Sequence, residues 1–481
     1  MYGGEEALGI REAQQISAST TRGATSTEEE ARTHCAGCRQ RDRRIRELEE
    51  RVAALEQKLA ERERAEHRQA GPFRRRNHVA HPKKPGRPNG HKPEHRPLPE
   101  HIDRIVDVPI DVCPDCQVPL VNKVMHTQYQ TDLPPVTPIV TQFNVHAGTC
   151  PCCGKYRQGH HPQQISDAVG AAGNQIGPVI LTMAAELKHR LGVAYGKICD
   201  FFETYLDISI CPATLCRAEQ RLAELARPTY ELLIDALRRC GVVHADETGW
   251  RISRLNAWLW VFSSQTVTIY AIRTSRGHEV PEEILGDFDG VLIVDGLATY
   301  DALDYFKGRC VGHILRRSRE LAEVCDHTDR QYVEQLIALL QEGLDLAERR
   351  DTLTRVGYAR RVQEIENRFD LWLDFHGRHP SPALERLARH LGDHRYQWLL
   401  FLYDETIPAT NNHAERMLRP AVITRKLGGC NKTLRGALVH SILSSLMVSC
   451  RQMGRRFLEF AKQLWYGMVP QAIAMEPQPD G

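Results

Sequence analysis

Hydrophobic residues change their spacing several times along the chain, and each change predicts a different kind of element. Between residues 45 and 59 they recur at steps of three and four, the a/d spacing of a coiled coil. Residues 176–237 keep a helical spacing, in segments such as VILTMAAELKHRLG and AYGKICDFFETYL. Beyond residue 240 the pattern becomes that of strands: AWLWVFSSQTVTIYAI predicts a hairpin, and short apolar runs precede Asp246 and Asp295.

The order of these patterns predicts a multidomain α+β protein. At 481 residues the chain exceeds one average domain, so several units are expected. Residues 1–34 are polar, rich in Ser, Thr and Glu and without periodicity, which predicts disorder. After them we expect a coiled coil at 35–68, a basic arm at 69–100, a zinc-binding unit at 101–160, a helical region at 165–238, an α/β domain at 239–466 with a helical insertion at about 305–400, and a tail at 467–481.

The overall charge of the chain says less about its function than the local clusters of charged residues do. The formal net charge of +2 neither requires nor excludes a nucleic-acid partner. No stretch approaches eighteen consecutive apolar residues, and the N-terminus lacks the basic-then-apolar layout of a secretory signal. We therefore expect a soluble, cytoplasmic protein.

The predicted coiled coil has a seam formed by Ile45, Leu48, Val52, Leu55 and Leu59. In a parallel homodimer each g residue faces the e residue five positions along on the partner. Here those pairs would be Arg44 with Glu49, Arg51 with Glu56, and Lys58 with Glu63, and all three attract. The charges favour a homodimer through residues 44–63, although the alternative is one amphipathic helix packed on its own chain. Two to three heptads are too short to be stable without other contacts.

A basic, Pro- and Gly-rich arm follows the coiled coil. Its prolines and glycines exclude a helix, and we expect it to contact DNA phosphates through Arg74, Arg75, Arg76, Lys83, Lys84, Arg87 and Lys92. The central Pro85-Gly86-Arg87-Pro88 resembles the core of an AT-hook, whose extended backbone lets an arginine enter a narrow minor groove. The alternative is a solvated linker, because charge runs often indicate only that.

Paired cysteines predict a structural metal site. The chain has fifteen cysteines, an odd number, and several lie close together, which favours metal ligation over disulfides. Two C-x-x-C turns, Cys113 with Cys116 and Cys150 with Cys153, match a four-thiolate zinc site. Cys152 is a spare that could replace its neighbour. A further pair, Cys35 and Cys38, has no second pair nearby.

The helical region at 165–238 is a candidate for DNA binding. A helix beginning at Pro212 follows the segment LDISI, so a helix, a turn and a second helix are expected. A helix-turn-helix would direct Thr214, Arg217 and Gln220 toward a groove. Ordinary packing between helices explains the same pattern equally well.

Two aspartates that follow apolar runs are the strongest candidates for catalysis. Asp246 in VVHADETGW and Asp295 in GVLIVDG each stand at the expected end of a buried strand. An aspartate in that place is most often a turn residue or a helix N-cap. Its recurrence instead suggests two carboxylates on neighbouring strands, which could share a magnesium or manganese ion.

A third acid, Glu415, lies far downstream in TNNHAERMLRPAVITRK. Asn411 or Asn412 can cap a helix, which places Glu415 on its first turn and Arg419 one turn later on the same face. Taken alone, this stretch indicates a surface pair between Glu415 and Arg419. Beside the two aspartates, Glu415 becomes a candidate third metal ligand.

Several blocks of the chain together resemble transposases of the insertion-sequence-66 family. These are HADETGW, NAWLWVF, RCVGHILRRSREL and TNNHAERMLRPAVITRK, preceded by the coiled coil, the KKPGRPNGHK arm, the cysteine turns and the helical region in the family's order. The resemblance covers nearly everything after about residue 35. One departure is ILRRSREL, where an acid is expected near Ser318, which puts the role of that turn in doubt.

The resemblance implies a ribonuclease H-like core with an Asp-Asp-Glu triad, here Asp246, Asp295 and Glu415. Its reaction would be metal-dependent cleavage and strand transfer of double-stranded DNA, with terminal inverted repeats and target DNA as partners and Mg²⁺ or Mn²⁺ as cofactor. A cytoplasmic, nucleoid-associated protein and accessory element-encoded proteins fit the same function. Backbone contacts near the metals would come from Arg419, Arg425 and Lys426, with His313 and Arg316 at the insertion's edge.

Two other functions compete with this one. A non-catalytic DNA-binding regulator derived from a transposase would keep the arm and the zinc unit but would need no triad, and all three acids are present. A ribonuclease H-fold nuclease would cut a specific DNA structure without joining ends, and only a strand-transfer assay would separate it from a transposase.

Overall fold

The computed structural model describes residues 43–45, 47–49, 51–52, 96–134, 136–376 and 381–468. The chain separates into two compact units, residues 1–101 and 102–481. Several predictions lie outside the described residues. They are the disorder of 1–34, the seam residues Leu55 and Leu59, the arm from Arg74 to Lys92, and the tail beyond residue 468.

The described part of the first unit is helical where the coiled coil is predicted. Residues 43–45, 47–49 and 51–52 are helical, and the seam residues Ile45, Leu48 and Val52 are 51%, 46% and 52% exposed. Arg44 forms an ion pair of 3.0 Å with Glu47 of the same helix. A half-exposed seam leaves room for a partner helix, and the coiled-coil dimer stays a prediction.

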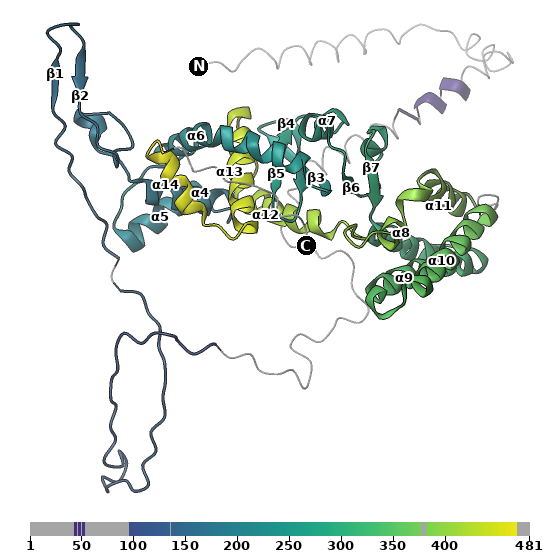
Figure 1. The fold of residues 1–481 in the computed structure, drawn as a ribbon, viewed down its shortest axis with the longest axis horizontal. Helices are drawn as coiled ribbons and strands as arrows, with labels where there is room; N and C mark the ends of the chain where they lie inside the picture. Colours follow the sequence, from purple (N-terminus) through teal and green to yellow (C-terminus); the bar gives the residue numbers. More distant parts are fainter. Residues whose placement is uncertain are drawn as a thin grey trace, which may run out of the picture. The chain divides into compact units, whose positions relative to one another are not determined.

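A mixed five-stranded sheet forms the centre of the second unit (Figure 1). The strand order is β5-β4-β3-β6-β7; β4 runs antiparallel to both of its neighbours, β3 and β5, whereas β6 and β7 run parallel to β3. The predicted hairpin is confirmed as β4 and β5. The strands are β3 (Val242–Ile252), β4 (Leu255–Ser263), β5 (Thr268–Arg273), β6 (Val291–Val294) and β7 (Phe306–Arg309).

The expected end of the first strand is wrong. β3 does not stop before Asp246 but continues through it to Ile252, because β4 pairs with it as far as the Ile252–Leu255 turn. Polar residues within DETGW broke the apolar run that sequence analysis relied on. Asp295, by contrast, directly follows β6 as expected.

Helices cover both faces of this sheet. On one face, Val243 and Ala245 of β3 join the largest core with residues of α6 and α13. On the other, Trp250 and Ile252 pack with Ala414 and other residues of α12. The helices outside the insertion are α4 (Pro178–His189), α5 (Tyr195–Leu206), α6 (Pro212–Arg238), α7 (Glu279–Leu285), α12 (Asn412–Gly428), α13 (Leu434–Gln452) and α14 (Phe457–Trp465), with short 3₁₀ turns η1 (Gly170–Gly173) and η2 (Ala298–Ala302).

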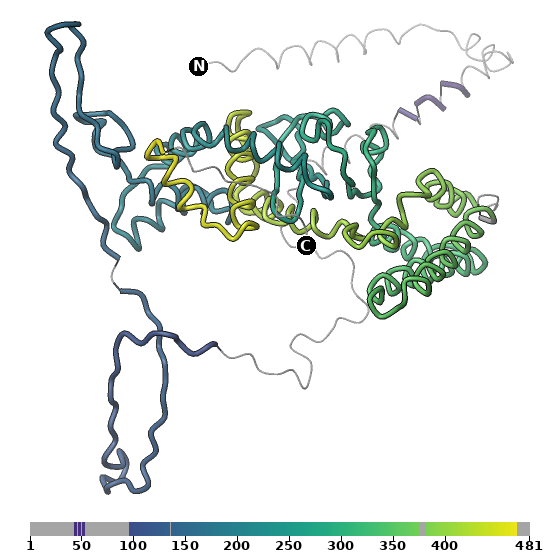
Figure 2. Tube along the Cα trace, viewed as in Figure 1, coloured from purple at the N-terminus to yellow at the C-terminus, as the bar shows by residue number. Residues whose placement is uncertain are grey.

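The predicted helical insertion is a separate bundle between β7 and α12. Figure 2 traces the chain from β7 into this bundle and back to α12. It has its own hydrophobic core, which includes Phe369, Trp372 and Trp398. Its elements are α8 (Val311–Val324), α9 (His327–Glu348), η3 (Arg350–Thr352), α10 (Arg355–His376), α11 (Pro382–Asp393), η4 (Arg395–Gln397) and η5 (Leu400–Leu402).

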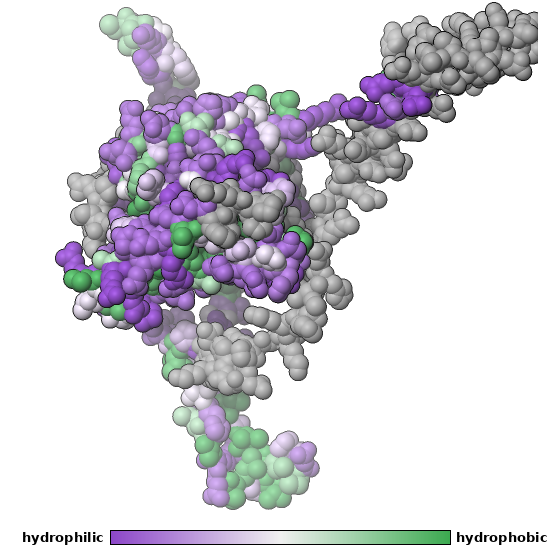
Figure 3. Space-filling view, turned by 90° about the vertical axis from the view of Figure 1, so that its right-hand side faces the viewer, coloured by the Kyte–Doolittle hydropathy of each residue, from purple (hydrophilic) through white to green (hydrophobic). Residues whose placement is uncertain are grey.

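The segment that precedes α4 has little regular structure. Its strands are the short antiparallel pair β1 (Ala147–Thr149) and β2 (Tyr156–Gln158). Many of its large hydrophobic side chains are exposed, among them Val108, Met125, Ile139 and Val140. Figure 3 shows hydrophobic residues, coloured green, gathered at the lower end of the view. None of the residues described between 96 and 177 is buried, so they form no core comparable to those of the sheet and the insertion. Among the described residues, no helix is both long and apolar enough to cross a membrane.

Helix α13 lies along β5 and closes that edge of the sheet. Backbone N–H groups of β5 donate to three serine hydroxyls of α13: Ile272 to Ser441 at 3.1 Å, Tyr270 to Ser445 at 2.8 Å, and Thr268 to Ser449 at 3.0 Å. Four helical residues advance about 6 Å and two strand residues about 6.6 Å, so serines four apart match alternate strand amides. An edge strand that would otherwise expose unpaired amides is thereby satisfied.

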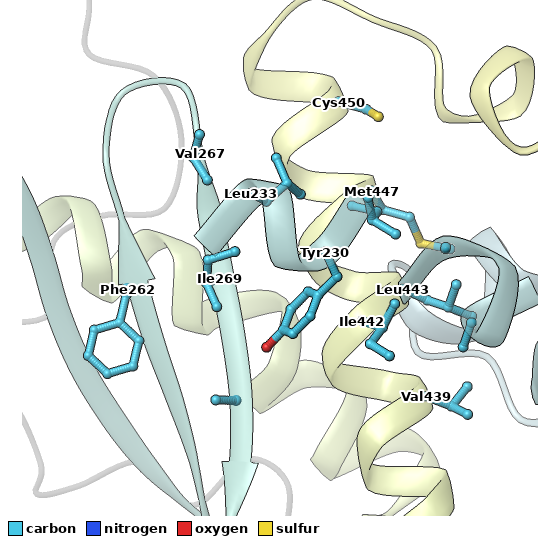
Figure 4. Packing of buried hydrophobic residues seen from close by; sticks show 14 of the residues in the cluster. Tyr230, Leu233, Phe262, Val267, Ile269, Val439, Ile442, Leu443, Met447 and Cys450 are labelled. Atoms are coloured by element: carbon cyan, nitrogen blue, oxygen red, sulfur yellow. The ribbon is translucent and has the colours of Figure 1, made fainter. Parts of the chain in front are cut away.

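These serines are tolerated within a helix because their hydroxyls bond in two directions. Ser441 and Ser445 also donate to the carbonyls one turn earlier, at 3.0 and 2.7 Å. Another side of α13 packs on α6, and Figure 4 shows Tyr230 of α6 pointing toward β5, where its hydroxyl donates to the Tyr270 carbonyl at 2.9 Å. α13 is therefore held by both polar and hydrophobic contacts.

The serine contacts predict a clear difference between adjacent serines. Ser445→Ala leaves the buried Tyr270 amide without its acceptor, which should lower the free energy of unfolding by about 1–3 kcal/mol. Ser444 is the matched control, because its buried hydroxyl has no hydrogen-bond partner. Ser444→Ala should be close to neutral in the same denaturant titration. Equal losses in the two variants would contradict the role given to the serine row.

Candidate active site

Asp246 and Asp295 lie at the same level on neighbouring parallel strands. The β3–β6 register pairs His244 with Ile293, so residues 246 and 295 each follow two positions later. Both side chains make local bonds: Asp246 Oδ1 accepts from the Glu247 amide at 2.8 Å, and Asp295 Oδ1 accepts from the Leu297 amide at 3.0 Å. The turn chemistry considered for these residues is present, but it does not explain their juxtaposition.

Burial and neighbouring negative charges both disfavour ionisation of Asp246. Burial, followed by the negative charges of Asp295 and Glu247, raises the pKa of Asp246 to about 7. A buried carboxyl near two others is costly to ionise unless a cation is close. The pair is therefore suited to binding a cation, and buried, perturbed carboxyls of this kind are frequent in active sites.

Glu247 is a buried acid that sequence analysis missed. It points to the face of β3 opposite Asp246, its side chain is only 2% exposed, and Arg276 Nη2 pairs with its Oε1 at 2.7 Å. The Tyr300 hydroxyl donates to its other oxygen at 3.3 Å. Burial raises the pKa of Glu247 and Asp295 raises it further, while Arg276 opposes that rise. The available signal was strand alternation, which directs an acid at position 247 inward.

Glu415 reaches this site from the first turn of α12. Its amide donates to the Asn411 carbonyl at 3.2 Å, and its carboxylate lies 3.5 Å from His313 Nε2. His313 belongs to the first turn of α8, and its pKa is raised by the Cys310 thiol and then by the charges of Asp295 and Glu415. His313 also lowers the pKa of Asp246. A single imidazole thus interacts with all three predicted acids.

The expected cap of α12 is wrong in its chemistry. Asn411 occupies the N-cap position, but its side chain makes no capping hydrogen bond. The amide reaches instead into the sheet, where Nδ2 donates to the Ala245 carbonyl at 2.7 Å and Oδ1 accepts from His244 Nδ1 at 3.0 Å. The Asn411 side chain therefore makes tertiary hydrogen bonds instead of capping the N-terminus of α12.

The predicted DNA-contacting residues that the structure describes fall into two groups. Arg419, Lys426, Arg316 and Arg217 are exposed. Arg425 instead bridges α12 to β3, donating to Thr248 Oγ1 at 3.1 Å and to the Gly249 carbonyl. Thr214 is half-buried, with its hydroxyl 3.2 Å from the Cys211 sulfur. Packing therefore accounts for part of the set.

The two cysteine turns have the same backbone geometry. The amide of Cys113 donates to Val118 at 2.9 Å and that of Cys150 donates to Lys155 at 3.0 Å, each five residues along. In each turn the residue four along donates back at 2.9 Å and has a positive φ, 57° at Gln117 and 66° at Gly154. The backbone amides of Cys116 and Cys153 lower the pKa of the Cys113 and Cys150 thiols, which favours the thiolate that zinc requires.

The structure does not bring either predicted metal site fully together. Within the residues that it describes, no three His, Cys, Asp or Glu side chains are close enough to hold one metal ion. Asp246 and Asp295 are neighbours and Glu415 joins them through His313, whereas the two cysteine turns remain separate.

Comparison with known proteins identifies the family. The sequence profile described as "Transposase IS66 family" matches residues 173–438, more than half of the chain, and this range contains all three acids. The chain belongs to this family of transposases. The resemblance noted in the sequence is thereby confirmed.

A curated relative of this IS66-family chain is the "Uncharacterized protein y4jD" of Sinorhizobium fredii (strain NBRC 101917 / NGR234). The two are 25% identical over 271 residues, which cover 49% of this chain and 51% of the relative. The match spans about half the length of that protein.

The Glu247–Arg276 pair gives a pH-dependent prediction for the metal-free protein. A carboxyl whose folded pKa lies above its unfolded value stabilises the fold below the unfolded pKa and loses that contribution as pH rises through the folded pKa. Arg276→Met removes the charge that opposes the raised pKa of Glu247. Because Arg276 is half-exposed, we expect a loss of only roughly 1–2 kcal/mol at pH 8, and much less at pH 5.

Denaturant unfolding of the parent and of Arg276→Met at the two pH values measures this difference. The double variant Arg276→Met/Glu247→Gln is the control, since without the carboxyl the pH dependence that Arg276→Met introduces should disappear. An equal loss for Arg276→Met at pH 5 and pH 8 would show that Arg276 acts by packing alone.

Proposed function

We propose that this chain is a DDE transposase, which cleaves the DNA of an insertion sequence and transfers its strands with Asp246, Asp295 and Glu415 as metal ligands. The observation that carries the proposal is the position of Asp246 and Asp295 at one level of adjacent parallel strands, where mutual repulsion contributes to a pKa of about 7 for Asp246. α12 adds Glu415 through its contact with His313.

The donor set fits a hard divalent cation. All three acids offer carboxylate oxygens, the ligands preferred by Mg²⁺ and Mn²⁺. When bound, such ions would activate water or a DNA 3′-hydroxyl and neutralise charge on the phosphate. The chain's own part is to hold the carboxylates together, to release the proton that Asp246 retains near neutral pH, and to keep His313 against Glu415.

The architecture supports a ribonuclease H-like core. A mixed sheet covered on both faces by helices carries the two aspartates, and the helical insertion separates Asp295 from Glu415. This arrangement agrees with what the family resemblance implies for the fold.

Double-stranded DNA, as terminal inverted repeats and target, is the proposed substrate. Three exposed cations lie on the helices that carry Glu415 and His313: Arg419 one turn after Glu415, Arg316 one turn after His313, and Lys426 in the last turn of α12. They could hold phosphates close to the acids. Arg217 of α6 and the basic arm would add contacts to DNA. The helix around residues 44–63 would join two copies of the chain. The protein would act at the nucleoid, with or without accessory proteins.

A structural zinc ion held by Cys113, Cys116, Cys150 and Cys153 is part of the same proposal. Two turns with matching hydrogen bonds and lowered cysteine pKa values support it. Bringing them together would also allow exposed side chains such as Met125 and Ile139 to be covered. Zinc binding would then contribute directly to the folding of this segment.

The triad is tested by Asp246→Asn, Asp295→Asn and Glu415→Gln in the full chain. Each should reduce Mg²⁺-dependent cleavage by at least about a thousandfold, because each removes several kcal/mol of transition-state stabilisation. DNA binding and thermal stability should remain near those of the parent. Asp289→Asn, at an exposed acid before the other end of β6, is the matched control and should cleave normally.

The outcome for each residue is judged separately. Near-normal cleavage in one of the three variants would remove that residue from the triad. A parent that cuts DNA but joins no ends in a strand-transfer assay would be a nuclease, and one that binds DNA without cutting it would be a regulator.

The zinc site is tested by elemental analysis of freshly purified protein. We expect about one zinc per chain in the parent and little in Cys113→Ser or Cys150→Ser, together with faster proteolysis of residues 101–160. Cys152→Ser changes an exposed thiol in the same turn as Cys150 and should retain the metal. Zinc-free parent protein would reject the site.

A further inference from the structure

Asn411 occupies an unusual position for a residue at a helix end, because it is completely buried. The parallel ladder between β3 and β6 ends at the His244–Ile293 pair, and Ala245 is the next residue of β3. Asn411 donates to the Ala245 carbonyl and accepts from His244, so its amide continues the bonding of β3 where β6 has stopped.

The backbone of Asn411 links two further parts of the site. Its N–H donates to the Cys310 sulfur at 3.2 Å, and Cys310 in turn donates its own N–H to the Val294 carbonyl at 3.0 Å, directly before Asp295. Its carbonyl accepts the Glu415 amide, the first helical bond of α12. Asn411 therefore contacts β3, the strand of Asp246, directly and contacts the end of β6, which precedes Asp295, through Cys310. It also begins the helical turn that carries Glu415.

We propose that Asn411 is a positioning residue that sets where Glu415 stands relative to Asp246 and Asp295. The inference rests on the proposed function of the three acids. A carboxamide is required because one side must donate and the other accept, in a fixed plane. An ionised aspartate has no donor for the Ala245 carbonyl, and alanine has neither group.

The neighbours of Asn411 strengthen this assignment. His244 is itself buried, and its Nδ1 lies 3.0 Å from Asn411 Oδ1. His413 fixes the same turn to the end of β4, with Nε2 2.8 Å from Ser263 Oγ. Asn412, between them, is exposed. The two adjacent asparagines thus differ in environment and form a matched pair for experiment.

The test measures Mn²⁺ affinity in the full-length protein, by electron paramagnetic resonance, together with DNA cleavage and the thermal midpoint. The variants are Asn411→Asp, Asn411→Ala and the control Asn412→Ala, each in the parent and in a Glu415→Gln background. Binding that persists in Asp246→Asn is subtracted as binding elsewhere. Asn411→Asp keeps the shape of the side chain and provides a variant that should fold if Asn411→Ala does not.

We expect either Asn411 variant to weaken Mn²⁺ binding about 10- to 100-fold in the parent, the range found when a residue that orients a metal ligand is changed. In the Glu415→Gln background the same change should have less than about a twofold effect, since the ligand being positioned is gone. Asn412→Ala should match the parent. Equal weakening in both backgrounds, or unchanged affinity in a folded Asn411→Asp protein, would overturn the inference.

This design separates the inference from the proposed function. If Glu415→Gln alone leaves Mn²⁺ affinity and cleavage unchanged, the triad fails whatever Asn411 does. If Glu415→Gln is inactive while the Asn411 variants bind Mn²⁺ normally, only the positioning role is rejected.

Discussion

The unequal lengths of β3 and β6 are the constraint on which the candidate site depends. β3 runs for eleven residues because the β4 hairpin partner supports it throughout, whereas its parallel partner β6 has only four. Beyond the His244–Ile293 pair, β3 has no parallel partner strand. β6 ends just before Asp295, which therefore lies beside Asp246. Ligand sites in sheets with parallel strands lie at the carboxyl ends of those strands, where such a gap opens. Here Asn411 fills part of the gap and begins α12, whose first turn places Glu415 3.5 Å from His313.

Alternation along β3 then places two neighbouring acids in different environments. Asp246 shares its face with α12 and is close to Asp295, and the resulting repulsion adds to the cost of burial. Glu247 points the other way, where Arg276 and Tyr300 bind it. The protein therefore compensates one buried charge internally and leaves the other under-compensated. This difference in compensation is the physical reason for proposing cation binding at Asp246 and a structural role for Glu247.

Two further sets of contacts hold the elements around the candidate site: those of α13 with the edge strand β5, and those of the loop after α4 with α12. The serine row of α13 satisfies the amides of β5, so the sheet ends in a helix and not in an open strand. At the loop after α4, Gly192 has a φ of +72°, and a Cβ there would lie only 2.9 Å from the Thr424 Cα of α12. Glycine allows this close approach. The last turns of α12 are thus held by the helical region while its first turn is held by Asn411.

Sequence patterns predicted the elements of this fold far better than the contacts between them. Periodicity identified the β4–β5 hairpin, the strand before Asp295 and the helices from α4 to α6, because each depends on residues close in sequence. Asn411 or Asn412 was expected to cap α12 for the same local reason, yet the partners of Asn411 lie at residues 244, 245 and 310. Both β3's continuation past Asp246 and the burial of Glu247 depend on other strands and helices. The two cysteine turns follow the same rule: each forms its own hydrogen bonds from local sequence, whereas a joint zinc site would require a long-range encounter that spacing alone does not determine. In this candidate site, contacts with residues distant in sequence override the local preference of a side chain. Asn411 is the clearest case, because it bonds to residues of β3 instead of capping α12.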